Sequence, residues 1–172
     1  RKIVNNGEGS DLLKDPKLVE KILTKTVRAI KKPVTVKIRK GFDEEHVNAV
    51  EIAKIAEGCG VAAVAVHGRT REQYYSGQAD WEIIAKLKQA ESIPVSGNGE
   101  VVDGPSAKAL LTQTACDGIM VGRAAQGNPW IFREIAHYLR TGEVQERPTG
   151  KEVYDTILSH AEMELAHKGE YT

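Results

Sequence analysis

Pro94-Val95-Ser96-Gly97-Asn98-Gly99-Glu100 is the stretch that decides the fold of this 172-residue chain. A short apolar run ends there at glycines beside a polar residue, and residues 117–123, Asp-Gly-Ile-Met-Val-Gly-Arg, repeat the pattern. Both runs are typical of buried parallel strands that stop at tight turns. The glycines allow backbone N–H groups to approach a ligand, and Arg123 adds a planar cation that suits a phosphate. Two such turns in succession predict a phosphate site like the one after strands 7 and 8 of a (β/α)8 barrel. Ordinary β-to-α turns that use glycine are the alternative.

Further along the chain, apolar strand-like runs alternate with helix-like segments. We expect strands at residues 34–39, 61–66, 94–99 and 118–122. We expect helices from the cap Asp15 to about 30, at 44–58, from the cap Asp80 onward, at 105–114, 129–139 and 151–167, with a loop before residue 15. This α/β alternation predicts four parallel βα units joined by right-handed crossovers. Four units make half of a TIM (β/α)8 barrel, and a doubly wound sheet is the alternative.

Polar side chains gather at the carboxyl ends of these strands. In a barrel the strand ends converge on one mouth, whereas in an open sheet they spread along an edge. The residues concerned are Lys37 and Arg39, His67 and Arg69, Asn98, and Arg123. Their distribution favours the barrel.

Composition narrows the class of protein. The chain has 24 basic and 24 acidic residues, so no net charge draws it toward nucleic acid, although a local basic patch is compatible with this balance. No apolar run approaches ~18 residues and the first residues hold no long apolar segment, so we expect neither a membrane span nor a signal peptide. Cys59 and Cys116 are too few for a disulfide framework and are expected to be small buried side chains in a reducing compartment. The histidines and cysteines show no ligand spacing, so we expect no metal.

Five motifs together carry a resemblance to a known family. They are residues 34–39 (Val-Thr-Val-Lys-Ile-Arg), 67–71 (His-Gly-Arg-Thr-Arg), 97–99 (Gly-Asn-Gly), 120–123 (Met-Val-Gly-Arg) and 127–130 (Gly-Asn-Pro-Trp). The chain resembles the tRNA-dihydrouridine synthases, flavin enzymes with an FMN-binding barrel and a small helical domain. The resemblance implies that residues 1–142 are the second half of that barrel. Residues 143–172 would then be a linker and the first helix of the helical domain.

The resemblance also implies a reaction, in which uridines of tRNA are reduced at their C5–C6 double bond. NADPH would reduce FMN, the flavin would give a hydride to the base, and a cysteine would supply the proton. Ile3, Gly9 and Ser10 fit the second half of the family's cysteine signature, which places that cysteine three positions before Arg1. The implied location is the cytoplasm, with tRNA as the partner.

Site residues follow from the same resemblance. Lys37 resembles a lysine that contacts the flavin ring, where a cation would stabilise the negative charge of the reduced form. His67 resembles a second contact to flavin or substrate. The residues that resemble contacts on the phosphate side are Asn98, Gly99, Glu100, Gly122 and Arg123. Two positions depart from the family pattern: Glu100 stands where Asp is common, and Ser96 where Gly or Ala is common. The longer side chain of Glu100 could move its carboxylate off any contact that Asp makes.

Arg69 and Arg71 are candidates for contact with the RNA backbone or the uridine, and solvated loop charges are the alternative. Two other functions also remain open. An FMN barrel that acts on a small molecule, such as a dihydroorotate dehydrogenase, would share the phosphate turns but not the motif at 67–71. A non-catalytic phosphate-binding half-barrel would bind no flavin.

Overall fold

The computed structural model describes residues 7–169, and within them four strands form one parallel sheet. The strands are β1 (Thr35–Arg39), β2 (Ala63–His67), β3 (Val95–Asn98) and β4 (Gly118–Met120). They lie side by side in the order in which they occur in the chain, β1-β2-β3-β4, and each neighbouring pair is parallel. The predicted strand positions are therefore confirmed, and each strand ends within a few residues of its predicted end.

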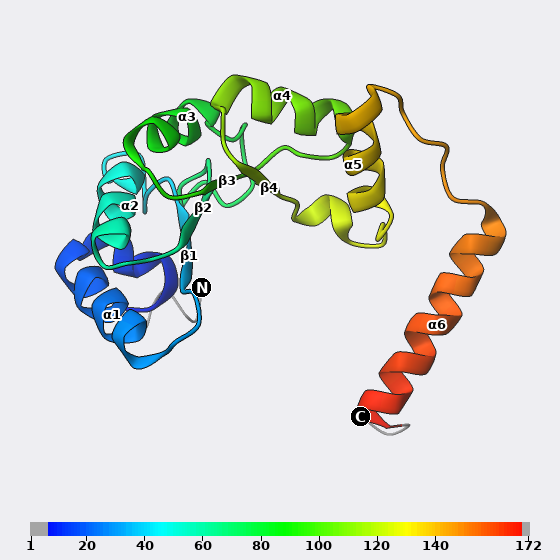
Figure 1. Cartoon of the computed structure of the whole chain (residues 1–172), viewed down its shortest axis with the longest axis horizontal. Helices are drawn as coiled ribbons and strands as arrows, with labels where there is room; N and C mark the ends of the chain where they lie inside the picture. The colour runs from blue at the N-terminus through cyan, green and yellow to red at the C-terminus, as the bar shows by residue number, and fades with distance from the viewer. Residues whose placement is uncertain (1–6, 170–172) are drawn as a thin grey trace.

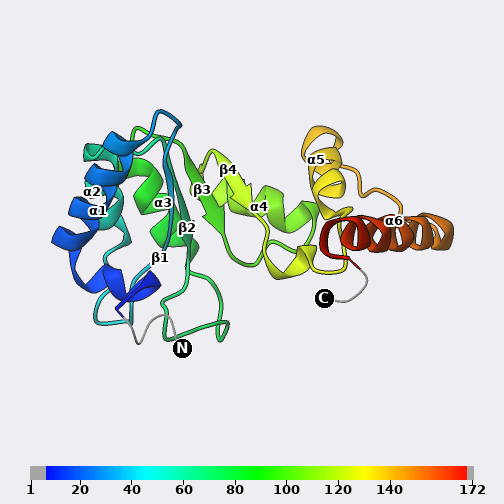
Figure 2. The same cartoon turned by 90° about the horizontal axis from the view of Figure 1, so that it is seen from below.

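Helices alternate with these strands. They are α1 (Pro16–Ala29), α2 (Ala49–Gly58), α3 (Trp81–Ala90), α4 (Gly104–Thr114), α5 (Ile131–Thr141) and α6 (Gly150–Lys168), with 3-10 helices η2 (Gly9–Lys14) and η3 (Arg123–Ala125). Helices α1 to α4 follow one another around the convex side of the curved sheet (Figures 1 and 2). A doubly wound sheet would have helices on both faces. Four parallel strands in chain order with these helices on one face are part of a (β/α)8 barrel wall, as predicted.

The register of the sheet separates its two faces. Val36, Val64 and Val95 are paired across neighbouring strands and pack toward the helices, where the core lies. The next position along each strand faces the opposite, concave side because side chains alternate. Lys37 pairs there with Ala65, which is followed across the sheet by Ser96 and Gly118. The cation in an otherwise strand-like run is therefore explained, because Lys37 belongs to the inward-facing set.

Above that row lies a second inward-facing row, at the carboxyl ends of the strands. It consists of Arg39, His67, Asn98 and Met120. Besides Lys37, the first row consists of the small residues Ala65, Ser96 and Gly118. These residues fill little of the concave side below the row at the strand ends.

Helix starts follow the capping residues that were predicted. The Asp15 carboxylate accepts a hydrogen bond from the Leu18 amide at 3.0 Å, and the Asp80 carboxylate accepts one from the Ile83 amide at 3.2 Å. Side-chain acceptors of this kind satisfy amides that the first helical turn leaves unpaired. These caps fix where α1 and α3 begin.

The predicted start of the second helix at residue 44 is wrong, because α2 begins at Ala49. The Lys40 carbonyl accepts hydrogen bonds from the amides of Asn48 and Ala49, and the Asn48 side chain donates to the Leu13 carbonyl at 2.7 Å. These contacts keep residues 41–47 in a turn that closes with a bridge between Gly41 and Val47. A second difference is η2, which occupies residues expected to be a loop.

The last helix differs from the others in its environment. Residues 143–149 have no helix or strand, and α6 then runs through Gly150–Lys168 without burying any of its residues. Figures 1 and 2 show α6 apart from the helices that cover the sheet. Its apolar side chains, among them Tyr154, Ile157 and Met163, are exposed. Among the described residues, no helix combines the length and the apolar character needed to cross a membrane.

Candidate functional site

The carboxyl ends of all four strands open into one cavity of about 640 Å³. Eight predicted site residues line it: Lys37, His67, Arg69, Asn98, Gly99, Glu100, Gly122 and Arg123. Arg39 and Tyr75 line it as well. A larger groove of about 870 Å³ lies along the outer helix α3 and shares only Glu100 with this cavity. We take the strand-end cavity as the candidate site because cationic side chains from separate strands converge on it.

The pKa of His67 reflects the positive charge around this cavity. Burial is the largest cause that lowers its pKa, from 6.5 to about 4, and Arg39, Lys37, Arg69 and Arg123 lower the pKa further. A shift of this sign and origin means that four cations act on the imidazole together. His67 is therefore neutral at pH 7 and able to donate or accept a hydrogen bond, in a cavity whose field favours an anion.

Lys37 lies one row below His67 on the concave side. Burial lowers its pKa, and the nearby charge of Arg39 lowers it further. Both effects disfavour the ammonium form, so this side chain would gain from a negative ligand.

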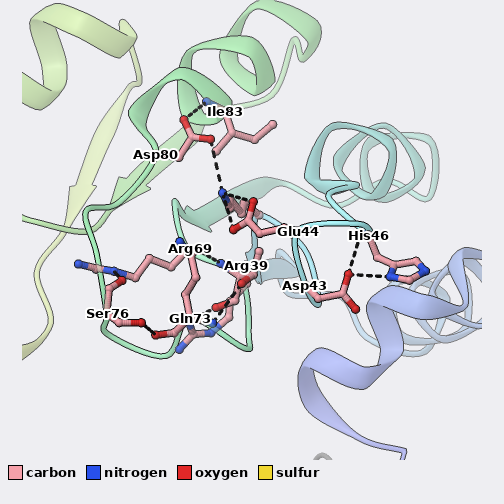
Figure 3. A network of polar contacts seen from close by, with 11 residues as sticks. Arg39, Asp43, Glu44, His46, Arg69, Gln73, Ser76, Asp80 and Ile83 are labelled. Carbon is pink, nitrogen blue, oxygen red and sulfur yellow. Dashed lines mark hydrogen bonds and ion pairs between the residues drawn. The ribbon is translucent and has the colours of Figure 1, made fainter.

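Arg69 is held inside the protein, with only 2% of the residue exposed. Its Nε donates to the Ser76 carbonyl at 3.2 Å (Figure 3). Its Nη2 donates to the Gly77 carbonyl at 2.8 Å and to the Glu100 carboxylate. The alternative of a solvated loop charge is therefore wrong for Arg69. Its contacts join the loop after β2 to the turn after β3, which is a positioning role. Contact with RNA stays a prediction.

Glu100 occupies the turn that follows β3. Its carboxylate accepts hydrogen bonds from Arg69 and from the Ala79 amide, the latter at 3.1 Å, so the longer side chain does reach partners. Gly99 has a φ of +123°, and a Cβ placed there would lie 2.6 Å from the Cβ of Ala79. Only glycine allows this approach of the turn to the loop. The predicted cofactor contact of Glu100 remains a prediction.

Two further phosphate-side candidates line the same rim. The Asn98 Nδ2 donates to the Met120 carbonyl at 2.6 Å, which joins the end of β3 to the end of β4. A Cβ built on Gly122 would meet no atom within 4 Å, so the backbone there faces open space. The cavity is thus bounded on this side by a fixed amide and an uncovered stretch of backbone.

Tyr75 and Arg39, the latter one of the polar residues at the strand ends, also line the cavity, although neither was predicted to bind cofactor or substrate. The Arg39 Nη1 donates to the carbonyls of Thr70 and Tyr74 at 2.8 and 3.2 Å. The guanidinium carbon of Arg123 lies 4.4 Å from the centre of the Tyr75 ring. Arg39 could be found from its place at a strand end, but no sequence signal pairs Tyr75 with Arg123.

Arg71 does not line the cavity. Its guanidinium carbon lies 5.5 Å from the centre of the Phe42 ring, and the Lys14 Nζ lies 3.5 Å from the same ring centre. The structure therefore separates Arg71 from the site residues with which it was grouped, and an RNA contact of Arg71 stays a prediction.

The two cysteines lie away from this mouth. Cys59 ends α2 ahead of β2, and Cys116 follows α4 ahead of β4, so both are at the amino ends of the strands. Cys116 is buried as expected, whereas Cys59 is only half-buried, with its Sγ 3.3 Å from the Thr24 Oγ1. Ile3 and the start of the cysteine signature lie outside the described residues.

A pair of carboxyl groups is found at the same amino-terminal end. Glu91 is buried, and its burial together with the neighbouring Glu57 raises its pKa to about 7. Glu57 accepts hydrogen bonds from the amide and hydroxyl of Ser92. In residues 7–169 no three His, Cys, Asp or Glu side chains are grouped so that they could hold a metal ion.

Comparison with known proteins supplies the family. A family model described as "Dihydrouridine synthase (Dus)" matches residues 1–172. A tRNA-dihydrouridine synthase B of Xanthomonas axonopodis pv. citri is 49% identical over 99% of this chain and 51% of its own length. One from Pseudomonas aeruginosa is 50% identical over 96% of this chain and 50% of its own length. Among solved structures, a mandelate oxidase mutant with (S)-mandelic acid has 15% identity and a TM-score of 0.47 over 72% of this chain and 50% of its own. The chain spans about half the length of the curated relatives it matches, and it belongs to the dihydrouridine synthase family.

Proposed function

We propose that this chain is the FMN-binding half-barrel of a tRNA-dihydrouridine synthase, which reduces the C5–C6 double bond of uridines in tRNA with NADPH as the reductant. Family membership supports the reaction class. The observation that carries the proposal is the strand-end cavity, where Lys37, Arg39 and Arg123 surround a neutral His67. We also propose that the enzyme acts in the cytoplasm, where its tRNA substrate is found.

The residues present fit FMN, which carries a phosphate on a polar chain attached to a flat ring. Within residues 7–169 the Arg123 guanidinium donates no hydrogen bond and forms no ion pair, so its donors are available to an anion. The glycine turn after β3 and the uncovered Gly122 offer backbone for a close approach. We therefore assign Asn98, Gly99, Gly122 and Arg123 to the phosphate side of the cofactor.

When bound, FMN would supply the hydride chemistry. Lys37 would provide positive charge on the floor of the site, where burial and Arg39 lower its pKa and an anionic ligand would offset both effects. His67 would hydrogen-bond as a neutral imidazole. The proton for the base would come from a cysteine three positions before Arg1. Cys59 and Cys116 lie at the opposite end of the strands, so we assign neither of them this role.

The remainder of the barrel would cover the open sides of the sheet. An apolar groove beside β1 is lined by Leu12, Val19 and Ile22, and a second one beside β4 is lined by Phe132 and Leu139. Apolar surfaces next to unpaired strand edges mark places where further elements pack. We propose that residues 1–142 complete a barrel in this way. Residues 143–172 would be the linker and first helix of a separate helical domain, and α6 would pack against the rest of that domain.

The test uses the full-length protein that contains this chain. Purified protein is expected to show the absorption spectrum of bound flavin and to form dihydrouridine in unmodified tRNA when NADPH is supplied. Free uridine and orotate, each supplied with NADPH, serve as control substrates. Protein that carries no flavin, or that reduces orotate but leaves tRNA unchanged, would refute the proposal. The 172 residues alone are expected to give no turnover, because the described residues form four strands and a closed (β/α)8 barrel needs eight.

A further inference from the structure

Tyr75 and Arg123 meet across the strand-end cavity although they come from different βα units. Tyr75 lies in the loop that follows β2, and Arg123 begins η3 after β4. The guanidinium carbon lies 4.4 Å from the ring centre, well inside the range of a cation–π contact. Both side chains line the cavity. The loop after β2 therefore passes beyond its neighbour β3 to reach the end of β4.

The contact orients the guanidinium without using its hydrogen bonds. A cation over an aromatic face is held by attraction to the ring quadrupole, which uses no hydrogen-bond acceptor. No hydrogen bond or ion pair of the Arg123 side chain occurs within residues 7–169, in contrast to Arg39 and Arg69, whose donors bind loop carbonyls. Of these three arginines, Arg123 is the one whose donors remain free to bind an anion.

The loop that presents Tyr75 is fixed from both sides. Arg39 donates to the carbonyl of Tyr74, the preceding residue, and Arg69 donates to the carbonyl of Ser76, the following one. The Ser76 amide also donates to the Gln73 carbonyl at 2.8 Å. Figure 3 shows Arg69 reaching this loop at Ser76, whose hydroxyl donates to the Gln73 carbonyl. Tyr75 is thus placed by its neighbours even though 52% of it is exposed.

We propose that Tyr75 is a positioning residue that holds Arg123 ready to bind the phosphate of FMN. This inference rests on the proposed function and adds a residue from outside the phosphate-binding turns. Tyr75 acts through Arg123 and does not itself contact the phosphate. The competing role is that the Tyr75 ring stacks on the flavin ring. The experiment below distinguishes that role from positioning of Arg123.

The experiment measures the dissociation constants of FMN and riboflavin for full-length protein by quenching of flavin fluorescence. Riboflavin lacks the phosphate, so it reports only on the ring and its chain. Tyr75→Leu is expected to weaken FMN binding about 3- to 5-fold, the effect of one exposed cation–π contact, and to leave riboflavin binding unchanged. Tyr75→Phe retains the aromatic face and should bind FMN as the unmodified protein does. In an Arg123→Ala background, Tyr75→Leu should have no further effect.

Tyr74→Leu is the matched control, since Tyr74 is similarly exposed at 47% and its ring contacts Tyr75 edge-on rather than Arg123. It should leave both constants unchanged. The inference is overturned if Tyr75→Leu binds FMN normally, if FMN and riboflavin weaken equally, or if the effect persists without Arg123. If the unmodified protein binds neither FMN nor riboflavin, the proposed function is refuted, and the inference, which depends on it, is refuted as well.

Discussion

Replacing Arg69 with Met removes a buried cation that holds together two parts of the candidate site. The substitution keeps an apolar side chain of similar length but leaves the carbonyls of Ser76 and Gly77 and the carboxylate of Glu100 without this donor. Each unpaired carbonyl costs about 1 kcal/mol. The Glu100 side chain is 34% exposed, so water replaces part of its lost partner. We expect Arg69→Met to lower the free energy of unfolding by about 2–4 kcal/mol, somewhat less than breaking a fully buried pair.

Urea denaturation of the full-length protein, followed by circular dichroism, measures this loss by linear extrapolation. Arg71→Met is the control, because within residues 7–169 the Arg71 side chain makes no hydrogen bond or ion pair and lies 5.5 Å from the centre of the Phe42 ring. Its replacement should cost less than about 1 kcal/mol. Adding Glu100→Gln to Arg69→Met removes the unpaired charge and should recover part of the loss. If the Arg69 and Arg71 variants lose the same free energy, the positioning role of Arg69 is wrong.

Four further outcomes are expected for the full-length protein. Arg123→Ala should weaken FMN binding by roughly 1.5–3 kcal/mol in a flavin titration, because a charged hydrogen bond to phosphate is lost, and unchanged affinity would remove the phosphate assignment. Lys37→Ala should slow flavin reduction by NADPH in stopped-flow measurements more than it weakens FMN binding, and a normal reduction rate would contradict its role. The folded-state pKa of Glu91, about 7, is above its ordinary 4.5, so its contribution to stability is complete below pH 4.5 and is lost as pH rises through 7. In the unmodified protein, the free energy of unfolding should fall by roughly 1–3 kcal/mol between pH 4.5 and pH 7 because of Glu91. Glu91→Gln should abolish this fall, as measured by thermal or urea denaturation across pH. Cys59→Ala and Cys116→Ala should each retain dihydrouridine formation on unmodified tRNA, and loss of activity in a folded, flavin-loaded variant would show that the proton donor is misassigned.

The sequence predicted the strands and most helix starts because their signals are local. β-Branched runs such as 34–39 fit a pleated buried strand, and Asp15 and Asp80 cap the helices that follow them. The start of α2 was mispredicted because it depends on a distant contact. The apolar pattern from residue 44 suits a helix, but the Lys40 carbonyl and the bond from Asn48 to Leu13 hold residues 41–47 in a turn.

The candidate site shows the same division. Lys37, His67 and Arg123 could be predicted because each lies at or near the carboxyl end of a strand, and parallel strands bring those ends together. What each side chain contacts depends on the path of the loop after β2, for which the sequence has no periodic signal. The burial of Arg69 and the cation–π contact of Arg123 with Tyr75 both follow from that path. Neither could be read from residue spacing.

The four strands lie in the sheet in the order in which they are synthesised, and this order affects how the chain can fold while it is being made. Each strand pairs with the one made just before it, after a crossover of only one helix, so the sheet can grow by adding each newly made strand to an existing edge. Such growth needs no long loop to close before pairing begins. The edge that remains open at each stage is the newest strand, and β4, with three residues including Gly118, presents a short template for unwanted pairing.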